Sequence, residues 1–213
     1  YIDIDNPVGT YCRPFTVPSD WNDQEIMLHF GSISGYAQVY LNGQRIGMTK
    51  ASKTPAEFNI TKFLKQGENL LAVQVYRWHD GSYMEDQDFW RLSGIERDVF
   101  LQAYPKLTIW DFFLKPDLDS QYKNGIFNAT VNVREFTNNN IKKGIVKLEL
   151  LDKTGKTVLV QQKTFNVDKE ITSLDFFGYI KNVEGWSAEK PNLYDCVISL
   201  HDNNNRQIAV IAY

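Results

Sequence analysis

The amino-acid sequence predicts an all-β protein, a jelly-roll β-sandwich followed by an immunoglobulin-like β-sandwich. Three observations predict this fold. Short segments alternate apolar and polar residues, which is the period of a half-buried strand. Turn-forming residues separate these segments at short intervals, and no long amphipathic helical pattern interrupts them. Many short strands joined by such turns are typical of sandwiches and barrels.

The first sandwich is expected over residues 1–104. The segment 36–41 alternates and is followed by Asn42-Gly43, the strongest short signal for a β-hairpin. Residues 70–76 are almost continuously apolar and predict a central strand, and residues 61–66 fit one helical turn. In the segment 25–30 we expect one buried face and one exposed face. The expected strands are 10–17, 25–30, 36–41, 44–48, 55–60, 70–76 and 98–103.

The second sandwich is expected over residues 105–213. Tyr104-Pro105-Lys106 marks the boundary, and after it Lys and Asn become more frequent. The expected strands are 107–114, 126–136, 144–152, 157–167, 171–180, 193–201 and 208–213. This number of strands in a domain of roughly 110 residues is typical of an immunoglobulin-like sandwich. The Cys–Trp–Cys spacing of antibody domains is missing.

Composition narrows the class of protein. A formal net charge of −3 argues against a nucleic-acid-binding surface, which needs a basic patch. No run of about eighteen apolar residues is present, so no membrane span is expected, and the protein is expected to be soluble, cytoplasmic or periplasmic. Cys12 and Cys196 are far apart and are expected to be small buried apolar side chains rather than a disulfide or a metal pair. The abrupt start at Tyr1 indicates a piece of a longer protein.

The stretch from Tyr76 to Phe100 does not fit an ordinary loop, because aromatic and charged residues are interleaved in it. Its acids are Asp80, Glu85, Asp86 and Asp88, and its arginines are Arg77, Arg91 and Arg97. Carboxylates beside aromatic planes suit a polyhydroxylated ligand, because carboxylates accept from hydroxyl groups and rings cover C–H faces. Alternatively, arginine–carboxylate pairs in this stretch simply hold the domain together. No companion His or Cys stands at ligand spacing, so zinc is not expected.

Several motifs carry a resemblance to a known family. They are Asn6-Pro7-Val8-Gly9, Val39 to Gly43, Pro55 to Phe58, Gly67 to Val73, Arg77-Trp78, the run from Asp80 to Val99, and Trp186 to Tyr194. Together they resemble the N-terminal half of the large β-galactosidases of glycoside hydrolase family 2. The resemblance covers essentially the whole chain, and it is strongest in residues 6–104 and 186–194.

This resemblance implies a sugar-binding jelly-roll (galactose-binding-like) domain, an immunoglobulin-like domain and then a catalytic (β/α)₈ barrel that this sequence does not include. Retaining hydrolysis of a β-galactoside needs two carboxyl groups about 5 Å apart, and the family places both on the barrel. No catalytic residue is therefore expected here, and the chain alone should be inactive. Any Mg²⁺ belongs to the missing barrel, and family members are often homo-oligomers.

For the loop, the resemblance implies that Asp88 reaches the sugar pocket. There it would contact the primary-hydroxyl region of galactose and help to hold a monovalent cation, commonly Na⁺. The residues expected to support the loop are Trp78, Asp80, Glu85, Asp86, Trp90 and Arg91, with Trp78, Phe89 and Trp90 as aromatic anchors. Three positions depart from the family pattern, because His79 stands where Ser is usual, Glu96 where an aromatic residue is usual and Asn59 where Asp is usual. They weaken any statement about the exact substrate.

Two alternatives to a portion of a glycosidase stay open at this stage. The chain could be a stand-alone carbohydrate-binding module, or a purely structural pair of sandwiches. The loop is expected to lack the exposed aromatic residues that a stand-alone sugar module needs, and this favours the glycosidase.

Overall fold

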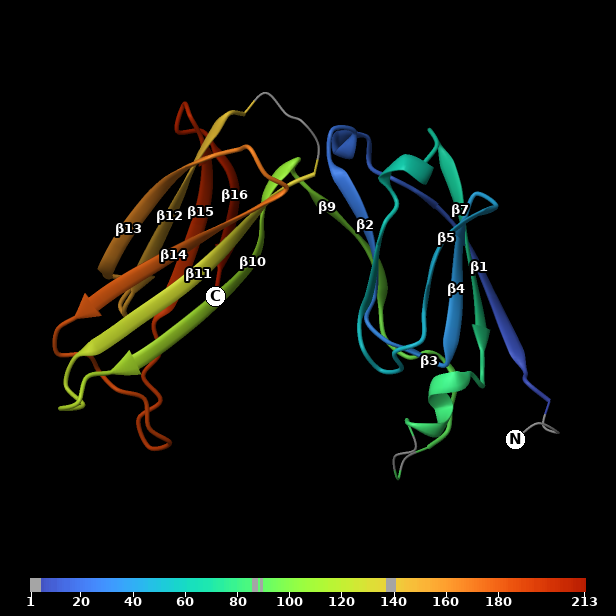
Figure 1. Cartoon of the computed structure of the whole chain (residues 1–213), viewed down its shortest axis with the longest axis horizontal. Coiled ribbons are helices and arrows are strands. Elements are labelled where there is room, and N and C mark those ends of the chain that lie inside the picture. Colours follow the sequence, from blue (N-terminus) through green and yellow to red (C-terminus); the bar gives the residue numbers. More distant parts are fainter. Residues whose placement is uncertain (1–4, 86–87, 89, 137–140) are drawn as a thin grey trace. The chain divides into compact units, whose positions relative to one another are not determined.

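A computed structural model describes residues 5–85, 88, 90–136 and 141–213. The chain divides into two compact units, Tyr1–Tyr104 and Pro105–Tyr213. Both units consist of antiparallel β-strands, as Figure 1 shows. The two sandwiches expected from the alternating pattern are therefore present.

Unit 1 is built from two main sheets and a short third one. One sheet has the order β1-β7-β4-β5, another β6-β2-β9, and β3 pairs with β8. The strands are β1 (Val8–Thr16), β2 (Glu25–Phe30), β3 (Ile33–Ser34), β4 (Tyr36–Leu41), β5 (Gln44–Thr49), β6 (Ala56–Asn59), β7 (Glu68–Tyr76), β8 (Gly94–Ile95) and β9 (Val99–Tyr104). The described residues of this unit also form the 3-10 turns η1 (Ser19–Trp21), η2 (Thr61–Phe63) and η3 (Asp80–Tyr83). The expected helical turn in residues 61–66 is η2.

The core of unit 1 lies between its two larger sheets. It is formed by alternate residues of the facing strands, because successive side chains of a strand point to opposite faces. β7 is the central strand predicted from residues 70–76, since it pairs with β1 on one side and β4 on the other. The buried residues of this core are Ile26, Leu28, Phe30, Ile33, Ala37, Val39, Leu41, Ile60, Leu71, Val73 and Val75.

Turn chemistry sets the register of these strands. Asn42 and Gly43 have φ values of 52° and 82°, so both adopt the left-handed conformation that a two-residue hairpin between β4 and β5 requires. The Asn42 side chain also donates to the amide oxygen of Asn69 at 2.8 Å, and its own oxygen accepts from the backbone of Leu70. The hairpin is thereby joined to the start of β7.

Unit 2 is a sandwich of a three-stranded sheet, β10-β11-β14, and a four-stranded sheet, β13-β12-β15-β16. The strands are β10 (Leu107–Leu118), β11 (Gly125–Glu135), β12 (Lys143–Leu151), β13 (Thr157–Asn166), β14 (Ile171–Ile180), β15 (Asp195–Asp202) and β16 (Gln207–Ala212). They match the expected strands to within a few residues. The core contains Val131 and Val133 of β11 together with Val146, Leu148 and Leu150 of β12, which the period-2 pattern predicts.

Two expectations about burial are wrong. β2 is buried on both faces, since Met27 is buried as well as Ile26 and Leu28. The reason is that side chains of the neighbouring strands cover its second face, where His29 stacks on Phe100 of β9 and contacts Glu57 of β6. Cys12 is exposed, whereas Cys196 is buried as predicted. Cys12 lies on β1, an edge strand whose residues are almost all exposed, so its position in the sheet outweighs the usual preference of cysteine for the core.

Among the described residues, no helix is long and apolar enough to cross a membrane.

Candidate functional site

The candidate site is the loop that joins β7 to β9, which carries the predicted sugar-contacting residue. The structure divides this stretch into η3 and the short strand β8, which the sequence pattern did not predict. β8 pairs with β3, so the second half of the loop is fixed to the sandwich by main-chain hydrogen bonds. Figure 1 shows η3 at the end of unit 1 where β7 stops.

His79 caps the first of these elements. The Nδ1 atom of its side chain accepts a hydrogen bond from the backbone N–H of Gly81 at 3.1 Å. The backbone N–H of His79 donates to Oγ of Ser82 at 3.0 Å. This reciprocal pattern is a capping box, and it satisfies two backbone donors at the start of the turn. The His79 side chain is only 6% exposed. His79, which departs from the family pattern, therefore has a structural role.

Asp80 joins the turn to the segment after β5. Its carboxylate receives a 2.7 Å hydrogen bond from Nζ of Lys50, and it also lies 3.5 Å from Nδ1 of His79. The hydrogen bond from Lys50 holds the pKa of Asp80 below its ordinary value, helped by the positive charge of Lys50 and by the N–H of Gly81. Because this pair is exposed, it adds little to stability.

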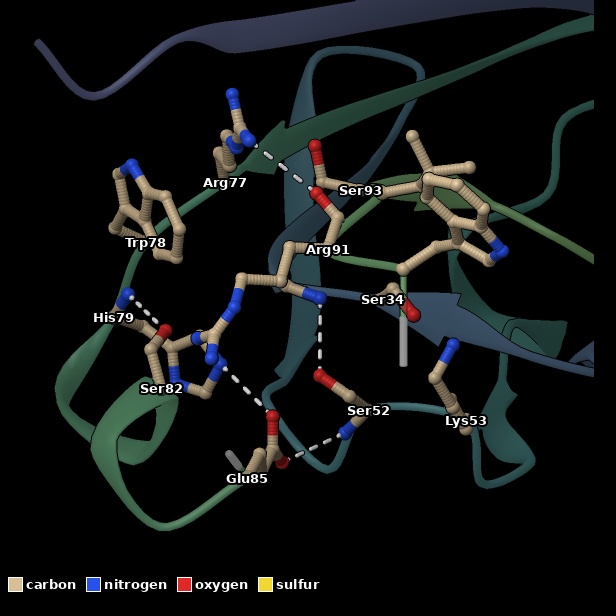
Figure 2. A pocket seen from close by; sticks show the side chains of 13 residues that line it. Ser34, Ser52, Lys53, Arg77, Trp78, His79, Ser82, Glu85, Arg91 and Ser93 are labelled. Carbon is tan, nitrogen blue, oxygen red and sulfur yellow. Dashed lines mark hydrogen bonds and ion pairs between the residues drawn. The ribbon is translucent and has the colours of Figure 1, made fainter. Parts of the chain in front are cut away.

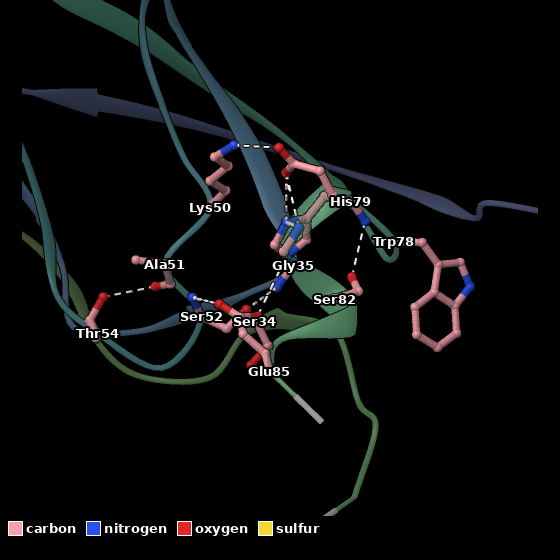
Figure 3. A network of polar contacts seen from close by, with 12 residues as sticks. Ser34, Gly35, Lys50, Ala51, Ser52, Thr54, Trp78, His79, Ser82 and Glu85 are labelled. Carbon is pink, nitrogen blue, oxygen red and sulfur yellow. Dashed lines mark hydrogen bonds and ion pairs between the residues drawn. The ribbon is translucent and has the colours of Figure 1, made fainter. Parts of the chain in front are cut away.

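A chain of contacts runs from His79 into the neighbouring loop (Figure 3). Nε2 of His79 faces Oε2 of Glu85 at 3.5 Å. The other carboxylate oxygen of Glu85 accepts from the backbone N–H of Ser52 at 3.1 Å, and Oγ of Ser52 accepts from the N–H of Gly35 at 3.1 Å. Gly35 has φ +106°, and a Cβ there would collide with the carbonyl oxygen of Tyr76, so a larger residue does not fit.

Glu96 forms a second polar cluster just beyond β8. Its carboxylate accepts from Oγ of Ser34 at 2.8 Å, from Oγ of Ser32 at 3.2 Å and from Nζ of Lys53 at 3.0 Å. Burial raises the pKa of Glu96, but the hydrogen bonds from Ser34, Lys53 and Ser32 outweigh that effect, so the pKa lies below its ordinary value. Lys53 thus ties the segment after β5 to the end of the loop.

Arg77 is expected to neutralise a carboxylate of the loop, but among the described residues it makes other contacts. NH2 of Arg77 donates to the backbone carbonyl of Arg91 at 3.3 Å, and its guanidinium lies 4.9 Å from the centre of the Trp78 ring. In the described part of the loop, the side chains beside the carboxylates of Asp80 and Glu85 are those of Lys50 and His79. Sequence reasoning missed the contributions of residues 50–53, because they lie far from the loop in sequence and form no motif with it.

Several of the residues expected to support the loop line a small hollow (Figure 2). It has a volume of about 80 Å³ and is lined by Ser34, Gly35, Ser52, Lys53, Arg77, Trp78, His79, Ser82, Glu85, Trp90, Arg91, Leu92 and Ser93. This is room for several water molecules, whereas small-molecule sites usually measure roughly 300–1,000 Å³. Trp78, Glu85, Trp90 and Arg91 thus lie around one hollow, which is too small for a sugar.

Asp88 is exposed, and in the described part of the chain no hydrogen bond or ion pair holds its carboxylate. Asp86 and Phe89 lie outside the described residues. The expectation that Trp90 anchors the loop is wrong for this chain, because its side chain is 78% exposed. The ring of Tyr83 is exposed as well, so the expectation that this loop lacks exposed aromatic residues is also wrong. The reason is that little of the described chain packs over this end of unit 1.

A metal site at the loop stays a prediction. In residues 5–85, 88, 90–136 and 141–213, no group of three His, Cys, Asp or Glu side chains is placed to hold a metal ion. A carboxylate such as Asp88 is a suitable ligand for a hard cation, but such cations need further oxygen ligands.

Comparison with known proteins places this loop in a family. The sequence model described as "Glycosyl hydrolases family 2, sugar binding domain" matches residues 1–105, and that described as "Glycosyl hydrolases family 2" matches residues 107–212. The chain belongs to glycosyl hydrolases family 2. The family assignment agrees with the resemblance of the loop motifs, and unit 1 corresponds to the sugar-binding domain of the family.

Relatives in the family include proteins named β-galactosidase. That of Priestia megaterium is 40% identical over 198 residues, which are 92% of this chain and 19% of the relative. The β-galactosidase large subunit of Lactobacillus acidophilus is 35% identical over 98% of this chain and 32% of its own length. The chain therefore spans about a fifth to a third of these curated relatives.

Solved structures show the same fold. A β-glucuronidase of Bacteroides uniformis superposes with a TM-score of 0.88 at 22% identity, over 99% of this chain and 26% of that one. A family 2 member from Bacteroides cellulosilyticus gives a TM-score of 0.80 at 22% identity, over 96% of this chain and 28% of that one. At this identity the likeness concerns the family fold only.

Proposed function

We propose that this chain is the non-catalytic N-terminal portion of a longer retaining β-galactosidase, and that the loop between β7 and β9 forms one wall of its sugar pocket. The observation that supports the proposal most is the 40% identity to a β-galactosidase over 92% of the chain, of which the chain spans only 19%. The rest of such a protein has ample length for a catalytic domain.

The chemistry of the loop supports a contact with substrate rather than catalysis. Asp80 and Glu85 are both engaged in contacts that hold the turn, so neither is a good candidate for proton transfer or nucleophilic attack. Asp88 is exposed and can accept hydrogen bonds from sugar hydroxyl groups with both carboxylate oxygens. A bound Na⁺ beside Asp88 would supply a further electrostatic contact for a hydroxyl oxygen. Asp88 would thus orient galactose for groups on the missing domain.

The test is hydrolysis by the full-length natural protein. We expect it to cleave 4-nitrophenyl β-D-galactoside much faster than 4-nitrophenyl β-D-glucuronide, and to release β-galactose first, as a retaining enzyme does. The chain of residues 1–213 should cleave neither compound. A full-length protein that cleaves neither, or prefers the glucuronide, would contradict the proposal.

One observation favours a second candidate, a carbohydrate-binding module. Tyr83 and Trp90 expose their aromatic rings on the same loop as the exposed Asp88, and exposed rings can stack on sugar C–H faces. Calorimetry of galactose with residues 1–213 separates the two candidates. We expect no measurable heat of binding, because most of the pocket is missing. Millimolar or tighter affinity would favour the module.

A further inference from the structure

We propose that the loop between β14 and β15, residues 181–194, is a surface on which a later segment of the same polypeptide docks, with Trp186 and Leu193 as its apolar anchors. This inference rests on one part of the proposed function, namely that the natural protein continues beyond Tyr213. It concerns unit 2, to which the proposed function gives no role. Figure 1 shows the loop protruding at the end of unit 2 where β14 stops and β15 begins.

The first support is the exposure of two large apolar side chains on this loop. Trp186 is 66% exposed and Leu193 is 69% exposed. Removing such side chains from water is favourable, and tryptophan is enriched among the residues that dominate the energy of interfaces. Single exposed apolar residues are common on protein surfaces, and what distinguishes these two is how firmly the loop that carries them is held.

The second support is that hydrogen bonds hold this loop in one conformation. The backbones of Ser187 and Lys190 exchange two hydrogen bonds, of 3.0 and 3.1 Å. The N–H of Asn192 donates to the carbonyl of Lys190 at 2.8 Å, and Nδ2 of Asn192 donates to the carbonyl of Gly185 at 3.1 Å. The loop backbone is therefore preorganised, and a preorganised surface loses little conformational entropy when a partner docks.

A hollow beside Leu193 makes part of this surface concave. It has a volume of about 200 Å³, and its lining includes Tyr194 and Val158 as well as the ion pair of Lys153 with Glu184. This volume is below the roughly 300–1,000 Å³ of usual small-molecule sites. Apolar groups beside charged ones are instead typical of protein–protein interfaces. The hollow therefore suits an apolar side chain of a docked protein segment.

The third support is the direction of the chain after β16. The backbone N–H and carbonyl of Tyr213 both pair with Cys196, at 3.0 and 2.8 Å. Because β16 is antiparallel to β15, residues that continue in the same direction pass Asp195 and then Tyr194, the last residue of the loop. A segment that starts there is tethered beside the loop, which gives it a much higher effective concentration than a second molecule has.

The relatives provide length for such a segment, since this chain spans only 19% of one and 32% of another. A later segment of the same polypeptide is therefore the favoured occupant of the loop, ahead of a second copy of the chain.

Thiol labelling compares the loop in the full-length natural protein with the same loop in residues 1–213. Leu193→Cys and Ala188→Cys place thiols at exposed positions of the loop. Ile171→Cys is the control at the opposite end of β14, where the native side chain is 46% exposed. All three are made in a Cys12→Ser background, and alkylation by iodoacetamide is followed at each site by mass spectrometry. In residues 1–213, all three thiols should react fast.

In the full-length protein, we expect alkylation at both loop positions to be at least about tenfold slower than in residues 1–213, with the control unchanged, because docking covers the loop. Adding Trp186→Ala to Leu193→Cys should bring the rate back to within about threefold of that in residues 1–213, since the docked segment loses a main anchor. Equal rates in the two proteins at both loop positions would overturn the proposal. Equal slowing at the control position would overturn it as well, because the protection would not be specific to the loop.

Cross-linking identifies what covers the loop. With an amine-reactive cross-linker, Lys190 of the full-length natural protein should link to residues beyond 213. The product should have the mass of one chain, and its yield should not change on dilution. A product with the mass of two chains, or slow alkylation of the loop already in residues 1–213, would identify a second copy as the occupant and overturn the proposal.

The hydrolysis assay on the same samples separates failure of this inference from failure of the proposed function. If the full-length protein cleaves 4-nitrophenyl β-D-galactoside but its loop is alkylated as fast as in residues 1–213, this inference is wrong and the proposed function stands. If the loop is protected but the galactoside is not cleaved, the proposed galactosidase activity is wrong and the docking surface stands.

Discussion

Nζ of Lys53 lies 3.0 Å from Oε1 of Glu96, a contact between residues 43 positions apart in the sequence. It joins the segment after β5 to the end of the loop that carries Asp88. Ser32 and Ser34 donate to the same carboxylate. The cluster therefore holds one end of the candidate site to the sandwich, and its charge state should affect the stability of unit 1.

We predict that Glu96→Gln lowers the free energy of unfolding at pH 7 by about 1–2 kcal/mol, because hydrogen bonds to a charged carboxylate are lost. The pKa of Glu96 is below its ordinary value of 4.5 in the folded state. Its contribution is therefore fully present above pH 4.5 and is lost as the pH falls through the lowered folded-state value. Urea unfolding across a pH series from neutral to acid tests this. The gap between wild type and variant should narrow toward acid pH, and a constant gap would contradict the assignment.

Asn69 should be important for the stability of unit 1. It is 0% exposed, its oxygen accepts from Asn42 and the N–H of Lys65, and its amide donates to the carbonyls of Lys65 and Gly67. We predict that Asn69→Ala lowers the free energy of unfolding by about 2–4 kcal/mol, because several buried polar groups lose their partners. Asn128→Ala, on an exposed face of β11, should cost less than about 0.5 kcal/mol. Equal losses from the two changes in urea unfolding would refute this interpretation of the network.

The two cysteines should differ sharply in reactivity. Burial raises the pKa of Cys196 to about 11, whereas Cys12 is exposed. Because the thiolate is the nucleophile, Cys196 should react very slowly at mildly alkaline pH. With a disulfide reagent such as Ellman's, we expect one fast thiol in the native chain, two in denaturant, and no fast thiol in Cys12→Ser. Two fast native thiols would show that Cys196 is accessible.

Local patterns predicted most of the strands. Asn42-Gly43 specified its hairpin because the turn requires positive φ. The apolar run of β7 predicted a central strand, and β7 pairs with β1 on one side and β4 on the other. The contacts of His79 with Glu85 and of Lys53 with Glu96 could not be predicted in this way. These contacts depend on which distant segments the fold brings together, and a local sequence pattern carries no information about that. The exposure of Trp90 was missed for the same reason, since an aromatic residue is buried only where another segment covers it.

The central claim is that Asp88 acts on the substrate, and its most direct test is the Asp88→Asn variant of the full-length natural protein. The quantity to measure is kcat/KM for 4-nitrophenyl β-D-galactoside, with the melting temperature measured on the same sample. Because Asp88 is exposed and makes no described contact, the account predicts an unchanged melting temperature and a loss of kcat/KM of at least about a hundredfold. A variant that keeps its activity, or that loses activity only because it unfolds, would contradict the claim.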